Sequence, residues 1–411
     1  MTDHTTGTPG PKPETLLITL TGADRPGVTS TILSTLAVAG VEVIDVEQIV
    51  LRGRLVLGLL VTAPRDWRKL RDSVEIAGTS VGMQVEIERG EGDNRSRPEG
   101  RSHVTILGSP LRATAMAAIA GRIADAGANI DRIERMARYP VTAIDLHVSG
   151  APTEVLRTSL AEEAARHGID VAVQAANLLR RGMRLIVMDV DSTLIQGEVI
   201  EMIAAHAGCE DEVARVTEAA MRGDLDFEAS LRSRVALLAG VPASALDEVY
   251  DAIQLTPGAR TMVRTLKRLG YRFAIVSGGF SQITDRLAAD LGIDFSRANE
   301  LEVVDGLLTG RIVGEVVDRA GKAKALREFA AATGVTEKAV IAIGDGANDL
   351  DMLNAAGLGI AYNAKPLVQQ AADTTVNVPY LDTIIYLLGI SREEVEAADA
   401  EAGIVTPAPP V

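Results

Sequence analysis

Two stretches of this 411-residue chain, residues 16–49 and 103–136, follow the same pattern. Each begins with a strand-like apolar run, passes through a glycine-containing turn and continues as a helix that leads into a second strand. A further strand, a helix and a last strand follow each stretch. The order βαββαβ is typical of the ferredoxin-like fold. We therefore expect two such domains, over 15–90 and 102–179, joined by a polar linker over 91–101.

Over residues 183–396 the pattern changes to apolar strands that alternate with helices, which indicates an α/β domain with a Rossmann-like parallel sheet. Between the first two of these strands, residues 197–256 are almost entirely helical in pattern. Because a simple crossover needs only about a dozen residues, we expect the surplus to form a helical cap above the sheet edge. Residues 1–14, rich in Thr, Pro and Gly, are expected to be disordered, and residues 397–411 to form a loose tail.

Composition limits what such a chain can do. The net charge of −15 and the lack of clustered Lys or Arg argue against a nucleic-acid partner. No segment approaches the roughly 20 uninterrupted apolar residues of a membrane-spanning helix, and the N-terminus has no signal-peptide pattern. The single cysteine excludes an intrachain disulfide and fits a reducing compartment. We therefore expect a cytoplasmic protein with no membrane partner.

The first chemically suggestive stretch is LIVMDVDSTL, residues 185–194, in which a strand-like run leads into Asp189 and Asp191. Ligands bind at the carboxyl ends of strands in open α/β sheets. Side chains two residues apart share a face, so both carboxylates would project there together. Two such carboxylates repel each other unless a cation or a shared proton compensates. Taken alone, the stretch is equally compatible with a helix N-cap.

Two further features are expected near the same edge. The stretch IVSGGF, residues 275–280, places Ser277 and two glycines after a strand, where hydroxyl and amide groups can meet a phosphate. A glycine-rich turn without any ligand is the simpler reading of that stretch alone. Lys322 begins a helix in DRAGKAKAL, where a solvated surface lysine is the default and Lys324 is a rival.

A last strand leads into IAIGDGANDLDML, residues 341–353, which carries Asp345, Asn348 and Asp349. So many polar groups after a parallel strand are hard to explain by structure alone. Mg²⁺ prefers hard oxygen ligands, often one or two carboxylates with phosphate and water. Asp189 and Asp345 would supply that set if their strands are neighbours.

In this order, DVDST, Ser-Gly-Gly, a lysine and GDGAND resemble the haloacid dehalogenase superfamily of phosphohydrolases, and within it the phosphoserine phosphatase family. The resemblance covers about residues 183–396, including the cap. The two repeats resemble ACT domains, which bind amino acids, in their pattern and in ADRPGVT at 23–29. The resemblance implies an enzyme that uses Mg²⁺ to hydrolyse O-phospho-L-serine to L-serine and phosphate, the last step of serine biosynthesis.

The resemblance also implies roles for residues. Asp189 would attack phosphorus to give an aspartyl phosphate. Asp191 would be the general acid and then the general base, with only its backbone carbonyl on the metal. Asp345 would complete the Mg²⁺ site, with Asp349 in support. Lys322 is preferred to its rival because its distance from GDGAND matches the family. The groups expected to hold the substrate's phosphate are Ser277, Gly278 and Lys322, and Asn348 is expected to bind the substrate as well.

The cap would supply the substrate specificity that the resemblance implies. Glu198 would accept the amino group of phosphoserine, and Arg234 would grip its carboxylate through a bidentate fork. Met221 and Phe227 would form apolar walls. Without the resemblance, Glu198 and Arg234 would be read as a solvated helix face. Two alternatives remain: a phosphatase of this superfamily with another small substrate, and a non-catalytic amino-acid sensor.

The repeats predict regulation of the C-terminal domain. The turns at Gly22–Gly27 and Gly108 lie where a strand meets a helix N-terminus, whose free amides can hold a carboxylate. Asp24 in the first copy, and Asn129 or Asp131 in the second, would receive the ammonium. We expect L-serine, the product, to inhibit partly through this region, and the tandem repeats to form a homodimer. The alternative is that the repeats only dimerise the protein.

Overall fold

The computed structural model describes residues 13–92, 100–182, 184–221 and 226–405. By their internal contacts the residues fall into two units, Met1–Arg97 and Pro98–Val411. The second repeat therefore belongs to the same unit as the C-terminal domain, whereas the first repeat is a unit of its own. Most of the segments expected to be disordered at the N-terminus and to link the repeats lie outside the described residues, although Glu14 already belongs to the first strand.

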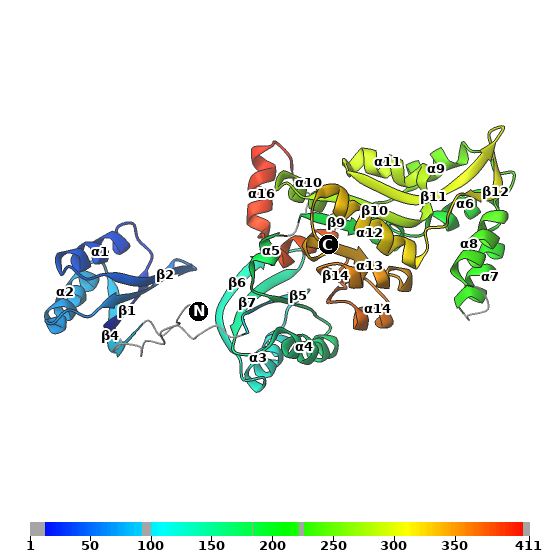
Figure 1. The fold of residues 1–411 in the computed structure, drawn as a ribbon. Coiled ribbons are helices and arrows are strands. Elements are labelled where there is room, and N and C mark those ends of the chain that lie inside the picture. Colours follow the sequence, from blue (N-terminus) through cyan, green and yellow to red (C-terminus); the bar gives the residue numbers. More distant parts are fainter. Residues whose placement is uncertain (1–12, 93–99, 183, 222–225, 406–411) are drawn as a thin grey trace, which may run out of the picture. The chain divides into compact units, whose positions relative to one another are not determined.

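The first unit has the ferredoxin-like order expected of it (Figure 1). Its elements are β1 (Glu14–Ala23), α1 (Val28–Val38), β2 (Val43–Leu51), β3 (Arg54–Thr62), α2 (Trp67–Ser80) and β4 (Met83–Glu91). The sheet has the strand order β2-β3-β1-β4, with β1 antiparallel to both of its neighbours. Strand alternation explains the packing, because Leu16, Ile18 and Leu20 are fully buried in one cluster with residues of both helices. The intervening Leu17 lies on the open face of the sheet and is 41% exposed.

The second repeat has the same order and topology. Its elements are β5 (Ser102–Gly108), α3 (Ala113–Asp125), β6 (Asn129–Ala137), β7 (Thr142–Ser149), α4 (Thr153–His167) and β8 (Asp170–Ala175). The sheet order is β6-β7-β5-β8, which matches the first repeat strand for strand. Val104 and Ile106 of β5 pack against the helices. A short helix, α5 (Leu178–Gly182), follows the last strand.

The C-terminal domain is built on a mostly parallel sheet of order β12-β11-β10-β9-β13-β14-β15. The strands are β9 (Leu185–Met188), β10 (Arg272–Phe280), β11 (Phe295–Val304), β12 (Leu307–Val313), β13 (Val340–Gly344), β14 (Leu358–Tyr362) and β15 (Thr374–Val376). Strand β9 lies between β10 and β13 and is parallel to both. All four of its residues are fully buried, as expected of a strand covered on both faces. The ends of β9 and β13 are therefore neighbours, as the predicted metal site requires.

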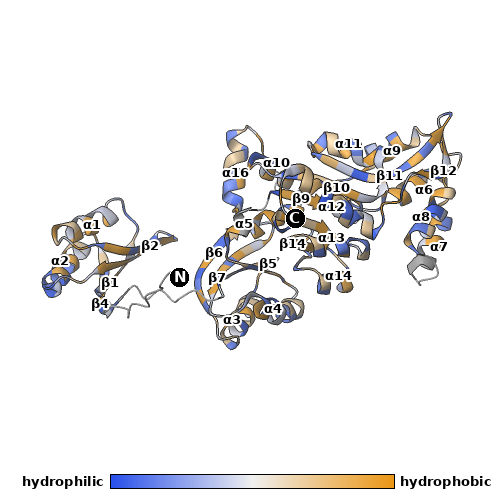
Figure 2. Ribbon diagram, in the orientation of Figure 1, coloured by the Kyte–Doolittle hydropathy of each residue, from blue (hydrophilic) through white to orange (hydrophobic). Residues whose placement is uncertain are grey.

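Helices cover this sheet, and in Figure 2 they carry both apolar and polar colours, as amphipathic helices should. They are α10 (Ala259–Arg268), α11 (Ser281–Leu291), α12 (Arg319–Thr333), α13 (Leu350–Ala355) and α14 (Pro366–Ala371). The predicted cap is confirmed between β9 and β10, where the described residues form α6 (Val199–Ala207), α7 (Glu210–Met221), α8 (Phe227–Ala236) and α9 (Ala245–Ala252). Among the described residues, no helix has the length and apolar composition needed to cross a membrane.

The chain ends in α15 (Ile384–Leu387) and α16 (Arg392–Glu401). The prediction of a loose tail over residues 397–411 is wrong for residues 397–401, which belong to α16, and residues 406–411 lie outside the described residues. Asp399 is only 1% exposed and forms ion pairs with Arg264 and Arg268 of α10, which fasten α16 to the domain. The sequence reading missed this because the partners lie some 130 residues away along the chain.

The second repeat is joined to the C-terminal domain along β8. Asp170 is buried, and its Oδ2 accepts hydrogen bonds from the backbone amides of Asn377 (2.7 Å) and Val378 (3.2 Å). Gln174 donates to the carbonyl of Leu387 at 2.9 Å. Leu107, on the open face of the repeat's sheet, belongs to the same hydrophobic cluster as the core of the C-terminal domain. The open face is thus partly buried, which the sequence pattern did not predict.

Candidate active site

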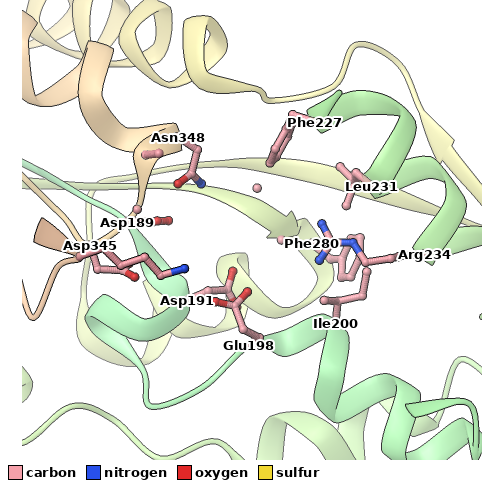
Figure 3. Close-up of a pocket in the computed structure, with 15 residues that line it drawn as sticks. Asp189, Asp191, Glu198, Ile200, Phe227, Leu231, Arg234, Phe280, Asp345 and Asn348 are labelled. Carbon is pink, nitrogen blue, oxygen red and sulfur yellow. The ribbon is translucent and has the colours of Figure 1, made fainter. Parts of the chain in front are cut away.

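The candidate site begins where β9 ends. The amide of Asp189 still donates to the carbonyl of Ile343 in β13 at 2.9 Å, so the sheet fixes its backbone. A tight turn over Val190–Leu194 follows, in which Ser192 has the left-handed φ of +55°. This turn brings both Asp189 and Asp191 to the lining of one cavity of about 260 Å³ (Figure 3). The predicted projection of the two carboxylates into a common site therefore agrees with the structure.

The two aspartates face different partners within that cavity. Asp191 accepts a hydrogen bond from the backbone amide of Val199 at 2.8 Å and one from the hydroxyl of Ser277 at 3.0 Å. Its carboxylate is therefore held between the cap helix α6 and strand β10. Burial raises the pKa of Asp191 above its ordinary value of 3.8. A raised pKa lets a carboxyl group hold a proton more readily, as a group that gives a proton to a ligand must.

Asp189 belongs instead to a group of three acids. The other two are Asp345 and Asp349. One carboxylate oxygen from each of the three residues lies within 4.8 Å of the other two. Asp345 follows β13 and accepts a hydrogen bond from the hydroxyl of Thr193 at 3.0 Å. Asp349 is completely buried and accepts one from the amide of Gly346 at 2.9 Å. The sequence-predicted acids from two separate motifs thus meet at neighbouring strand ends.

Lys322 lies directly among these acids. Its Nζ is 2.7 Å from Asp189 Oδ2 and 2.7 Å from Asp349 Oδ1, and its side chain is fully buried. Burial by itself would lower the pKa of Lys322, but the two carboxylates outweigh it and raise the pKa above its ordinary value. The rival Lys324 is 64% exposed and faces Glu315. The structure therefore selects Lys322, which is held in the first turn of α12.

The acid group retains excess negative charge even with this lysine. Burial, followed by repulsion from Asp349, raises the pKa of Asp189 well above 3.8 and that of Asp345 to about 6. The pKa of a carboxyl group rises in this way when neighbouring carboxylates repel its charged form, and a bound cation would relieve that repulsion. The donors are all hard carboxylate oxygens, which fit a divalent ion such as Mg²⁺.

Groups suited to a phosphate lie beside the acids. Ser277 is fully buried, and its hydroxyl accepts from the amide of Gly279 at 2.7 Å. Ser277 and the two glycines were expected to follow a strand, but they lie within the last part of β10. This part is irregular, because the pairing with β11 shifts register between Val276 and Phe280. A Cβ at Gly279 would lie 2.9 Å from Asp191 Oδ2, so only glycine leaves room there. Gly278 and Asn348 also line the cavity, as predicted.

The opposite wall comes from the cap, as Figure 3 shows for Phe227, Leu231 and Arg234 of α8. The buried Nε of Arg234 has no hydrogen-bond partner within the described part of the chain, and burial lowers the pKa of this arginine. Glu198 lines the cavity as well. Burial, followed by repulsion from nearby aspartates, raises the pKa of Glu198 to about 7. Glu198 accepts a hydrogen bond from the hydroxyl of Ser192 at 3.2 Å. An arginine and a glutamate therefore face one cavity, which suits a ligand carrying both charges.

Several lining residues were missed in the sequence. Leu231 lies four residues after Phe227 and three before Arg234, so helical spacing could have found it. Ile200, Phe280 and Lys365 also line the cavity, but no local pattern marks them. Met221, expected as an apolar wall, ends α7, and its side chain lies outside the described residues.

The residues predicted to bind a regulator lie in the two repeats. Asp24 and Gly27 are exposed, and Gly27 precedes α1 with a φ of +96°. Gly108 is buried, and a Cβ there would lie 3.2 Å from both Ile169 and Leu111. Asn129 and Asp131 are exposed on β6 and hydrogen-bond to each other at 3.0 Å. Ligand binding at these positions stays a prediction.

Comparison with known proteins identifies the domains. Residues 186–354 match the family model of the haloacid dehalogenase-like hydrolases, and residues 14–88 and 101–174 each match a model of the ACT domain. A phosphoserine phosphatase of Streptomyces coelicolor is 63% identical over 390 residues, covering 94% of this chain and 95% of the relative. The chain belongs to the phosphoserine phosphatase family.

Other relatives agree with that assignment. A phosphoserine phosphatase of Mycobacterium tuberculosis is 53% identical over 395 residues, which cover 95% of this chain and 97% of the relative. Among solved structures, a probable phosphoserine phosphatase from Vibrio cholerae is similar with a TM-score of 0.58 at 35% identity, over 73% of this chain and 88% of that one. A haloacid dehalogenase family hydrolase from Salmonella enterica serovar Typhi gives a TM-score of 0.62 at 28% identity, over 70% and 98%. The resemblances seen in the sequence motifs are therefore confirmed for both kinds of domain.

Proposed function

We propose that this protein is a phosphoserine phosphatase that hydrolyses O-phospho-L-serine to L-serine and phosphate. One observation carries the proposal. A single cavity is lined by the buried Asp189, by Glu198, which lies beside Asp191, and by Arg234 of the cap. Asp189 and its neighbours suit a phosphoryl group, whereas Glu198 and Arg234 suit an ammonium and a carboxylate. The names of the S. coelicolor and M. tuberculosis relatives support the same substrate.

In the proposed reaction Asp189 is the nucleophile. Its carboxylate forms a bond to phosphorus while the bond from phosphorus to the serine oxygen breaks, leaving an aspartyl phosphate. Lys322, 2.7 Å away, favours the ionised form of Asp189 that this attack requires. Asp191, whose pKa is raised by burial, gives its proton to the departing serine oxygen. The same carboxylate then takes a proton from the water that hydrolyses the aspartyl phosphate.

The phosphoryl oxygens would be held by groups around the cavity. The Ser277 hydroxyl, the Gly278 amide, the Asn348 side chain and Lys322 are the donors we assign to them. Mg²⁺ would be held by Asp189, Asp345 and the backbone carbonyl of Asp191, with Asp349 in support. When bound, Mg²⁺ would neutralise charge on the phosphoryl oxygens. The excess negative charge of the acid group supports this assignment.

The amino-acid end of the substrate would be held by the cap. Arg234 would pair with the substrate carboxylate and Glu198 with the ammonium. The apolar wall that encloses the serine methylene is assigned to Phe227, Ile200 and Leu231. Because both charged residues are largely buried, leaving either of them unpaired would be unfavourable.

Substitution of Arg234 tests the substrate assignment. Arg234→Ala should lower kcat/KM for phosphoserine by the equivalent of about 2–5 kcal/mol, because it leaves the substrate carboxylate unpaired. Activity on an aryl phosphate, which has no such carboxylate, should change far less. Arg232→Ala is the matched control, since Arg232 lies on the same helix but is exposed and pairs with Glu228. Equal losses on both substrates would show that Arg234 is structural or acts on the phosphate.

The pH dependence of binding tests Glu198. Its pKa of about 7 means that the carboxylate is neutralised below that pH. KM for phosphoserine should therefore rise as the pH falls below 7, whereas KM for an aryl phosphate should not follow the same curve. Glu198→Gln should remove the difference between the two substrates. An unchanged phosphoserine profile in this variant would assign the dependence to another group.

Two alternatives are separated by simple assays. A panel of phosphorylated metabolites, with and without Mg²⁺, distinguishes phosphoserine from another small phosphate ester. Asp189→Asn should abolish turnover while the fold is retained, and a phosphoryl group trapped on Ser277 would contradict the assignment of the nucleophile. Phosphate release by the wild-type protein would exclude a purely non-catalytic amino-acid sensor.

We further propose that the protein acts in the last step of serine biosynthesis in the cytoplasm, as a homodimer inhibited by L-serine through its ACT domains. Regulation requires different affinities of serine for active and inactive states, typically about 1–3 kcal/mol of coupling. Gly108→Val should weaken inhibition without changing turnover at low serine, since the added side chain crowds Leu111 and Ile169. Purely competitive inhibition that survives deletion of residues 1–180 would contradict this regulation.

A further inference from the structure

Two histidines and an aspartate meet on the sheet of the second ACT domain. Strands β5 and β7 are antiparallel, and His103 lies directly opposite His147 in their register. Asp145 precedes His147 by two residues, so its side chain projects from the same face. Thr105 lies opposite Asp145 and completes a two-by-two arrangement. The pairing of β5 with β7 therefore places these four polar side chains next to one another on one face of the sheet.

The geometry of the three ligand-type side chains suits a metal ion. His103 Nδ1 is 2.8 Å from Asp145 Oδ2, and His147 Nε2 is 3.6 Å from the same oxygen. One potential donor atom from each residue lies within 4.8 Å of the others. Bonds of about 2.0–2.1 Å in a tetrahedral zinc site place ligand atoms about 3.3 Å apart. Small side-chain adjustments would therefore bring these atoms around one ion.

The surroundings support and orient these groups. The hydroxyl of Thr105 donates to Asp145 Oδ1 at 2.9 Å, which fixes the buried carboxylate and leaves Oδ2 toward the histidines. His103 is 17% exposed and His147 36%, so an ion can reach them from solvent. Burial lowers the pKa of His147, which favours the neutral ring that a metal requires. Arg180 Nη2 is 3.7 Å from Asp145 Oδ2 and would be displaced from that oxygen by an ion.

The first ACT domain shows that the fold does not require these residues. When Gly22 of β1 is matched to Gly108 of β5, the positions that correspond to the three ligand-type residues are Leu17, Gly58 and Leu60. An identical topology is therefore built without histidine or aspartate at this place. The cluster is an addition specific to the second domain.

We propose that His103, Asp145 and His147 form a zinc-binding site in the second ACT domain, with water completing the coordination. Two imidazoles and one carboxylate are a ligand set that zinc accepts readily, and three protein ligands leave one position open. The site is separate from the acid group at the sheet edge and does not depend on the proposed reaction.

The direct test follows the imidazole ¹⁵N signals of untagged, full-length protein during a zinc titration with Mg²⁺ in excess. The chain has five histidines, so the signals can be assigned by substitution. The signals of His103 and His147 should shift together and saturate at one equivalent. Those of His167, which faces Glu163, and His206, which faces Glu248, should stay in place. Zinc binding without any change at His103 and His147 would overturn the proposal, as would the absence of binding.

Variants give an independent measure of affinity. Loss of a residue that only supports a metal ligand typically weakens binding about 10–100-fold, so His147→Asn or Asp145→Asn should weaken zinc binding about 100-fold or more. His206→Asn is the control, because this half-exposed histidine lies in the cap. Phosphatase activity and the thermal midpoint without zinc report whether each variant is folded. Zinc that binds instead to the acid group of Asp189, Asp345 and Asp349 would bind all variants equally. Equal zinc affinity of the wild type and a folded His147→Asn variant would overturn the proposal.

Discussion

The two ACT domains share one topology but differ in what happens to the open face of their sheets. In the first domain this face carries large apolar side chains, yet Leu17 is 41% exposed, Ile49 48% and Leu51 61%. In the second domain the face carries polar groups such as His103 and Asp145 among its apolar residues. It is nevertheless partly buried, because this domain packs against the phosphatase domain.

The hydropathy of a sheet face therefore does not by itself decide whether another domain packs against it. The second domain is fastened by specific polar contacts, from Asp170 to the amides of Asn377 and Val378 and from Gln174 to the carbonyl of Leu387. Such contacts fix an orientation that apolar area by itself leaves open. The apolar face of the first domain is instead of the kind that binds another protein surface, and a second copy of this chain is the partner we propose.

The largest expected effect comes from placing a charge on the covered face. Ala143 is fully buried in the cluster that also contains the core of the phosphatase domain, so Ala143→Asp should bury an unpaired carboxylate. The free energy of unfolding of residues 98–411 should fall by about 3–5 kcal/mol. Urea denaturation followed by enzymatic activity measures this. Val56 of the first domain occupies the position that matches Ala143 and is 37% exposed. Val56→Asp should change the free energy of unfolding of residues 98–411 by less than about 0.5 kcal/mol. Similar effects of the two substitutions would contradict the conclusion that the open face of the sheet is buried in the second domain and exposed in the first.

The next effect concerns the polar junction. Asp170→Ala removes the acceptor for two backbone amides and for the side chain of Asn377. Unfolding should become easier by about 1–3 kcal/mol, because buried donors lose their partner. The matching position in β4 is the exposed Gln84, which lies opposite Thr21 as Asp170 lies opposite Leu107. Gln84→Ala should be nearly neutral, and a neutral Asp170→Ala would show that the junction does not depend on these bonds.

A smaller effect should appear in the pH dependence of stability. Burial raises the pKa of Asp170 above 3.8, so the folded protein holds this proton more tightly than the unfolded chain does. The contribution of this group to stability is therefore complete below pH 3.8 and is lost as the pH rises through the raised pKa. Asp170→Asn should lack this decline, so its free energy of unfolding relative to wild type should improve as the pH rises above 3.8. Parallel pH profiles of the two proteins would contradict the assignment.

The smallest effect on folding is expected on the open face of the first domain. Leu51→Asp should change the free energy of unfolding by less than about 0.5 kcal/mol, because Leu51 is 61% exposed. If that face joins two copies, however, the variant should elute as a monomer in light-scattering chromatography, where the wild type elutes as a dimer. Leu269→Asp, at an exposed leucine of the phosphatase domain, is the control and should not alter the mass. A dimeric Leu51→Asp variant would place the interface elsewhere.

The order of elements could be predicted along most of the chain because it depends on local periodicity. The βαββαβ repeats, the parallel strands after residue 183 and the helical cap all follow from spacings of two or about three and a half residues. The carboxylates of DVDST and GDGAND could be placed at strand ends for the same reason. Their meeting required only that β9 and β13 be neighbours, which the structure shows.

The sequence by itself determined which chemical groups are available and on which elements they lie. Only the tertiary structure decided which of them have partners: Lys322 is buried between two carboxylates while Lys324 is exposed, and Asp399 is bound by arginines of a distant helix. It also decided that His103 meets Asp145 and His147 across a strand pair, and that the second ACT domain packs against the phosphatase domain. The physical reason is that periodicity is a property of neighbouring residues, whereas burial and charge pairing arise between residues that are tens to hundreds of positions apart.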